Sequence, residues 1–143
     1  MLFTGEQLLK GLWAGCLWTV GYLVAPTLFA LLEDRSLAGQ LAGAMFTAAT
    51  VTSLVIAAAL AGLYAWLGQG ARWRLVLTLS AAALLAANEW GLRPFMEAAR
   101  LGDGSPGPSF GMLHGISAVL WLAASLATLV LAALPRPASG REG

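Results

Sequence analysis

Residues 36–71, SLAGQLAGAMFTAATVTSLVIAAALAGLYAWLGQGA, run without one charged side chain. Residues 11–32 and 75–88 are also free of charge, and residues 104–135 carry only the titratable His114. A helix needs about 20 apolar residues to cross a hydrocarbon core roughly 30 Å thick. The pattern predicts an all-α fold, a four-helix transmembrane bundle with spans at about residues 8–32, 37–67, 73–93 and 110–134. Pro94 is expected to end the third span, and residues 95–101 to form a short surface helix.

The composition excludes an ordinary soluble domain. Charged residues make up 10% of the chain and hydrophobic ones 59%, with a mean hydropathy of +0.77, whereas soluble domains carry about 25% charged residues. Because four spans and their loops use the chain, residues 1–143 are predicted to form a single integral membrane domain ending in a disordered tail, 135–143. The net charge of +1 and the lack of a basic stripe speak against nucleic acid. Cys16 is the sole cysteine, so no intrachain disulfide can form.

The distribution of Lys and Arg among the loops predicts the orientation, since cytoplasmic loops are enriched in these residues. Five fall on the side of the two termini and three on the other side. The first group is Lys10, Arg72, Arg74, Arg136 and Arg141, and the second is Arg35, Arg93 and Arg100. We therefore expect both termini in the cytoplasm.

Two pairs of glycines four residues apart predict close helix packing. Gly11 and Gly15 lie in the first span, and Gly39 and Gly43 in the second. Small residues at this spacing let the backbone of another helix approach closely in a membrane. Replacing Gly39 or Gly43 by a bulky residue is therefore expected to destabilise the bundle.

Polar residues at membrane depth are the natural pointers to a functional site. Counting along each helix at 1.5 Å per residue places the unusual residues of several spans in the same outer leaflet. Glu89 and Arg93 are four apart and can form an ion pair. We predict a shallow polar pocket between the outer ends of the first, third and fourth helices. Its binding residues are Pro26, Asn88, Glu89, Arg93, His114 and Ser117.

Motifs for catalysis are missing from the sequence. It has no glycine-rich phosphate loop, no Cys or His cluster and no nucleophile–base spacing, so no catalytic residue is predicted, and the balance leans against an enzyme. One histidine cannot supply two axial haem ligands, and we predict no cofactor and no bound metal. An alternative is a copper site, because three methionines could offer soft ligands beside His114. These are Met45, Met96 and Met112.

Four segments of the chain resemble a known family. They are GYLVAPTLF at 21–29, AGQLAGAMF at 38–46, NEWGLRPFM at 88–96 and FGMLHGIS at 110–117. As a set they resemble the four-helix family typified by transmembrane protein 205, whose bacterial members are a domain of unknown function. The family is distantly similar to copper-resistance membrane proteins and to four-helix haem-pathway oxidases. The resemblance implies a four-span bundle, here in a bacterial inner (plasma) membrane, with polar points at Pro26, Asn88, Pro94, His114 and Ser117.

Three functions stay open at this stage. The first is handling of a small solute or ion through the outer-leaflet polar site. The second is a structural or accessory bundle that assembles with itself or with a larger membrane complex. The third is a haem- or copper-linked redox protein. In every case the surrounding partner is the lipid bilayer.

Overall fold

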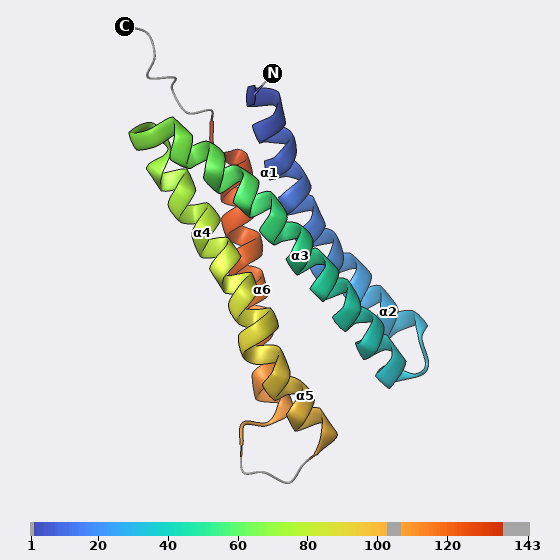
Figure 1. Ribbon diagram of the computed structural model, residues 1–143. Coiled ribbons are helices and arrows are strands. Elements are labelled where there is room, and N and C mark those ends of the chain that lie inside the picture. Colours follow the sequence, from blue (N-terminus) through green and yellow to red (C-terminus); the bar gives the residue numbers. More distant parts are fainter. Residues whose placement is uncertain (1, 103–106, 136–143) are drawn as a thin grey trace, which may run out of the picture.

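The computed structural model describes residues 2–102 and 107–135, which are almost wholly helical and contain no strand (Figure 1). The predicted tail lies, except for Pro135, outside the described residues. The elements, in chain order, are α1 (Leu2–Trp18), the π-helical η1 (Thr19–Val24), α2 (Ala25–Leu31), α3 (Arg35–Leu67), the 3₁₀ turn η2 (Gly68–Ala71), α4 (Arg72–Ala86), the π-helical η3 (Ala87–Leu92), α5 (Arg93–Leu101) and α6 (Phe110–Ala133).

Four continuous helical rods are long and apolar enough to cross a membrane. They are Thr4–Leu31, Arg35–Leu67, Arg72–Leu101 and Phe110–Ala133. Large apolar side chains such as Leu31, Val55 and Val119 stay exposed on them. Such surface would promote aggregation in water but matches lipid. The all-α prediction is confirmed, and the chain is an integral membrane protein.

The third rod corrects the expectation about Pro94. Proline does not end this rod, because Pro94 lies in the first turn of α5. Proline has no N–H to donate, and the helix continues through this position by way of the π-helical η3 just before it, where Arg93 donates its N–H to the Asn88 carbonyl. The segment expected to be a separate surface helix therefore continues the third rod.

The two rods that contain proline share one local device. Each has a six-residue π-helical segment that ends two residues before the proline, η1 before Pro26 and η3 before Pro94. The residue preceding each proline donates its N–H to a carbonyl five residues earlier, Ala25 to Val20 and Arg93 to Asn88. Such π turns redirect a helix and recur at functional sites.

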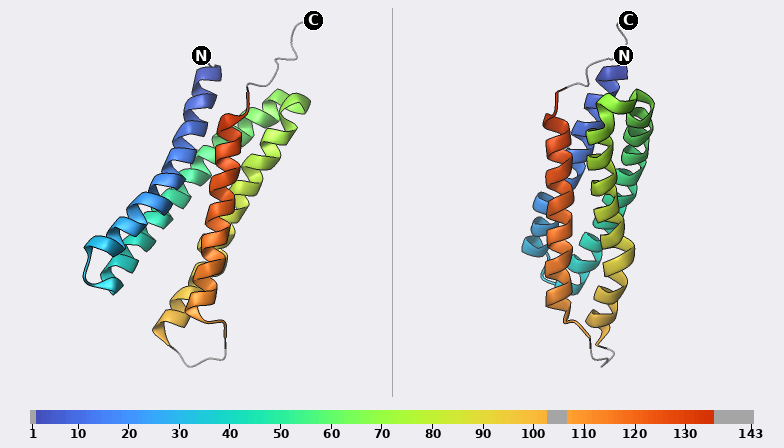
Figure 2. Two further views of the ribbon diagram at one scale, coloured as in Figure 1. Left: turned by 180° about the vertical axis from the view of Figure 1, so that it is seen from behind. Right: turned by 90° about the vertical axis from the view of Figure 1, so that its left-hand side faces the viewer.

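The rods form two helical hairpins that diverge along their length. At one end α2 packs on α3 and α5 packs on α6, and Figure 2 shows the two pairs spreading apart there. We call this the open end. At the opposite, closed end lie the start of α1 and the end of α6 (Figure 1). The side of the membrane that each end faces stays a prediction.

The core sits between the closed end and the point of divergence. It is built from buried side chains of all four rods, among them Trp13, Leu17, Leu60, Leu85 and Trp121. Trp121 of α6 is the outermost large member of this core toward the open end. Its indole Nε1 donates to the Leu17 carbonyl at 3.3 Å, and its ring meets Phe46 edge-on with 4.6 Å between centroids.

The glycines behave differently from the prediction. Gly11 and Gly15 are exposed, and a Cβ built on either would meet no atom of the described chain within 4 Å. The expected helix packing at this pair is therefore not found among residues 2–102 and 107–135. The close contact lies instead at Gly21, where a Cβ would come within 3.0 Å of Trp121 Cδ1 and nearer still to Nε1.

A buried charge cluster fastens the closed end. Glu6 and Lys10 form an ion pair at 3.3 Å, and their side chains are 1% and 0% exposed. Tyr64 of α3 donates its hydroxyl to Glu6 Oε1 at 3.0 Å, and Lys10 donates to the Leu134 carbonyl at 3.4 Å. Arg74 donates to the Pro135 carbonyl. Cations thus satisfy carbonyls at the end of α6, where the helix dipole is negative.

Gly21→Ala should lower stability by about 1–3 kcal/mol, the usual range for overpacking a tight contact, because the added methyl displaces Trp121. Gly15→Ala is the matched control in the same rod and should leave stability unchanged or raise it, since its Cβ meets open space. Unfolding midpoints in detergent compare the two variants. Equal effects would contradict the role assigned to the Gly21 contact.

Lys10→Met should destabilise the protein by about 3–5 kcal/mol, because it leaves the Glu6 carboxylate buried without its cation. Glu97→Gln removes one partner of an exposed ion pair and should change stability by about 1 kcal/mol or less. Chemical unfolding in micelles measures both. A Lys10 variant as stable as the Glu97 variant would show that the closed-end pair is not held out of water.

Candidate functional site

A cavity of about 1040 Å³ lies at the open end, between the α2–α3 and α5–α6 pairs. All four rods contribute to its wall. The structure brings all six predicted site residues to this wall, namely Pro26, Asn88, Glu89, Arg93, His114 and Ser117. Convergence of residues that are far apart in sequence shows that they share one chamber. That they bind a ligand stays a prediction.

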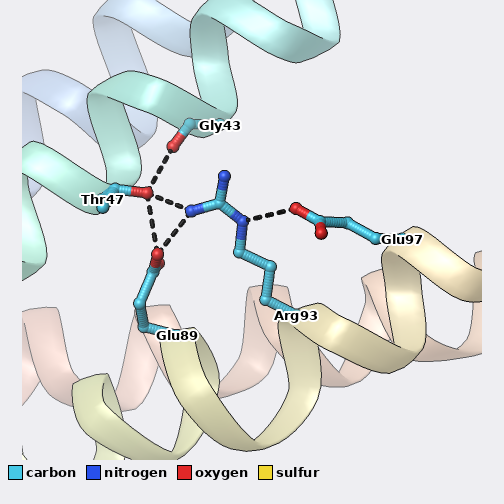
Figure 3. A network of polar contacts seen from close by, with 5 residues as sticks. All are labelled: Gly43, Thr47, Glu89, Arg93 and Glu97. Carbon is cyan, nitrogen blue, oxygen red and sulfur yellow. Dashed lines mark hydrogen bonds and ion pairs between the residues drawn. The ribbon is translucent and has the colours of Figure 1, made fainter.

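An ion-pair network joins one wall of the cavity to the other (Figure 3). Arg93 donates to the carboxylate of Glu89, which is 11% exposed, and to Glu97 Oε1 at 3.0 Å. It also donates to the hydroxyl of Thr47 on α3. The Thr47 hydrogen can serve Glu89 Oε1 at 2.7 Å or the Gly43 carbonyl at 3.0 Å. The expected Glu89–Arg93 pair is confirmed. Both residues lie on the third rod, and Thr47 links the pair to α3.

The glycine pair of α3 accommodates arginine side chains. A Cβ on Gly43 would lie 3.5 Å from Arg93 Nη2, and one on Gly39 would lie 3.7 Å from Arg100 Nη1. Arg100 donates to Ser36 Oγ at 2.6 Å and to the Ser36 carbonyl at 3.3 Å. The small residues therefore make room for guanidinium groups from α5, where the sequence predicted the backbone of a helix.

The inner part of the cavity is apolar, and its mouth is polar. Trp121 and Phe46 line the inner part, while Arg35 and Ser36 from the first turn of α3 line the mouth. Asp34 caps this turn by accepting from the Ser36 and Leu37 N–H groups at 2.7 and 3.1 Å. Asn88 also lines the cavity, and its buried Oδ1 has no hydrogen-bond partner in the described part of the chain.

His114 and the methionines do not assemble as the copper alternative requires. His114 is exposed and stacks on Phe110 with 5.8 Å between ring centroids. Met96 shares the cavity wall with it, whereas Met45 and Met112 are exposed residues outside that wall. Among the described residues no three His, Cys, Asp or Glu side chains group together as metal ligands would.

Several wall residues were missed by the sequence analysis. Arg35 and Arg100 line the cavity but were used only to predict orientation. Thr47 of α3, which bonds to Arg93, was not placed in the site either. The contact of Arg100 with Ser36 joins residues 64 positions apart, and no local spacing signals it. The one available hint was the row of Glu89, Arg93, Glu97 and Arg100, which puts four charges near one face of a helix.

Comparison with known proteins places the chain in a family. The model of a family described as Domain of unknown function (DUF4149) matches residues 8–104, more than half of the chain. The chain belongs to this family. The matched range includes Pro26, Asn88, Glu89 and Arg93 but ends before α6, which carries His114 and Ser117. No curated protein and no solved structure matches the chain.

Arg93→Ala should cost about 1–3 kcal/mol of stability, because it removes charge-assisted bonds to Glu89, Glu97 and Thr47 at once. Arg100→Ala, the matched control on α5, loses only bonds to the uncharged groups of Ser36 and should cost less. Unfolding midpoints in detergent rank the two variants. If Arg100→Ala lowered the unfolding midpoint as much as Arg93→Ala or more, the network around Arg93 would not be the main link between the walls.

Proposed function

We propose that this integral membrane protein binds a small solute or ion in the open-end cavity and handles it at the membrane. The observation that supports this most is the gathering of six polar or helix-perturbing residues from three rods on one wall. Polar groups at membrane depth pack away from lipid and mark solute pathways. A chamber of about 1040 Å³ is also at the upper end of the usual range for ligand sites.

The chemistry of the wall supports the same proposal. The Asn88 acceptor has no protein partner in the described chain and lies at the cavity, where a water molecule or a solute can donate to it. Three arginines and two glutamates line the chamber, so it carries an excess of one positive charge when His114 is neutral. The two π-helical segments hold Tyr22 and Asn88 on that wall, from opposite helical hairpins.

The orientation belongs to the proposal as well. We place the open end on the outer side, both termini in the cytoplasm, and the protein in a bacterial plasma membrane. The support is the distribution of Lys and Arg along the sequence, with five in the segments on the side of the termini and three in the others. The likeness to the transmembrane protein 205 family is compatible with this arrangement. The likeness to copper-resistance proteins would add a redox role, which His114 and Met96 alone support poorly.

A second candidate function is an accessory bundle that assembles with itself or with another membrane protein. The observation in its favour is the exposed face of Gly11 and Gly15, which the described chain leaves uncovered. Close approach of a second helix there follows the rule for small residues in membranes. Gly11→Leu would then reduce the oligomer mass measured by light scattering, with Leu12→Ala on the neighbouring face as control.

Cysteine labelling tests the proposed cavity. In a Cys16→Ser background, the Ser117→Cys variant should react in intact cells with a membrane-impermeant maleimide, because Ser117 lines a chamber proposed to open outward. The Ser125→Cys variant, altered on the same helix, should stay unreactive, because Ser125 is 0% exposed. Labelling of the Ser117→Cys variant only after permeabilisation would reverse the orientation, and no labelling under either condition would refute a hydrated cavity.

A matched pair of α6 variants then tests binding. Ala118 lines the cavity, whereas Val119 points away and is 65% exposed. Ala118→Phe should abolish the thermal stabilisation produced by any solute that binds the cavity, and Val119→Phe should preserve it. A solute that stabilises both variants equally binds elsewhere.

A further inference from the structure

We propose that the occupant of the cavity is an anionic membrane lipid, with its phosphate at Arg35 and Arg100 and its apolar part against the aromatic inner wall. This inference rests on the proposed function and names the ligand class of the same site. It follows from three features of the wall, namely its uncompensated cations, its apolar interior and its position.

The first feature is the unequal pairing of the three arginines. Arg93 is held between two carboxylates, those of Glu89 and Glu97. Arg100 bonds only to the hydroxyl and carbonyl of Ser36, and no carboxylate of the described residues pairs with it or with Arg35. At the mouth of the cavity, these two guanidinium groups therefore have no carboxylate in ion-pair contact among the described residues. Guanidinium groups favour phosphate because they can bind two of its oxygens at once.

The second feature is the change of chemistry along the cavity. Three aromatic residues, Tyr22, Phe29 and Phe110, contribute to the cavity wall together with Phe46 and Trp121. Phe46, at the inner part, lies about 16 Å along α3 from Arg35 by helical rise. A free phosphate would use only the mouth and leave this apolar wall in contact with water. A molecule with a charged head and an apolar tail satisfies both parts.

The third feature is the position of the cavity between the hairpins. The wall residues come from η1, α2 and α3 on one side and from η3, α5 and α6 on the other, in membrane-length rods. Figure 2 shows the two pairs spreading apart at this level. A lipid can enter sideways from its own leaflet without passing through water. The net positive wall disfavours a choline headgroup, which brings a cation next to Arg35 and Arg100.

Native mass spectrometry of the intact protein tests the proposal, with phosphatidylglycerol and phosphatidylcholine of identical acyl chains as probes. The wild type should retain one phosphatidylglycerol with at least about tenfold preference over phosphatidylcholine. Arg35→Gln combined with Arg100→Gln should abolish this preference, and Arg35→Lys with Arg100→Lys should keep most of it. Arg72→Gln at the closed end is the control and should change nothing.

The cavity pair distinguishes binding inside from binding on the surface. Ala118→Phe should lose the retained phosphatidylglycerol and Val119→Phe should keep it, with both variants checked for folding by circular dichroism and gel filtration. Retention by both variants would overturn the inference, because the lipid would then sit on the outer surface. Suppose instead that the wild type retained both lipids equally and that Ala118→Phe abolished this retention. That result would overturn the preference for an anionic lipid and leave the proposed function standing.

Two further measurements distinguish a membrane phospholipid from other anionic ligands. Inorganic phosphate that displaces phosphatidylglycerol at millimolar concentration, or oleate that binds more tightly than the phospholipid, would overturn assignment to a membrane lipid. Absence of any retained lipid, together with labelling of the Ser117→Cys variant from outside, would refute this inference while the hydrated cavity persisted. If neither lipid retention nor labelling of the Ser117→Cys variant were observed, the proposed function would be refuted as well.

Discussion

The divergence of the two hairpins depends on the contact of Trp121 with the first rod. The indole lies where Gly21 offers no side chain, and it donates to the Leu17 carbonyl. Toward the closed end the rods pack around a shared core, and toward the open end long polar side chains bridge the diverging hairpins, Arg93 to Thr47 and Arg100 to Ser36. The cavity reaches inward as far as this indole, a large and rigid side chain that packs against the first rod at this level.

The two ends of the bundle accommodate charged side chains in opposite ways. At the closed end Glu6 and Lys10 are removed from solvent and saturated mostly by groups of neighbouring helices, although Glu6 Oε2 has no partner in the described chain. At the open end the Glu89–Arg93–Glu97 row remains partly exposed and leaves cationic groups at the mouth. The first arrangement resists opening, since separation of the rods would expose or orphan a buried charge. The second leaves charge available to a ligand.

The π-helical segments connect local sequence to this arrangement. Both precede a proline by the same offset, and both contribute residues to the cavity wall. A π turn carries one extra residue per turn and shifts the side chains that follow it. In each rod it sits at the level where the hairpins part. The chain thus uses one device twice, once in each hairpin, to shape the chamber.

The sequence by itself determined the membrane class, the four rods and the meeting of six polar residues at one level. These features depend on hydrophobic length and on the rise of a helix, which local residues specify. The Glu89–Arg93 pair was equally predictable, because residues four apart on a helix are neighbours. Only the tertiary structure decided which glycine is crowded, and that Gly39 and Gly43 receive arginines. Only the fold buried Glu6 and Lys10, since their partner Tyr64 lies 58 residues beyond Glu6 and helical spacing carries no information about which rods become neighbours.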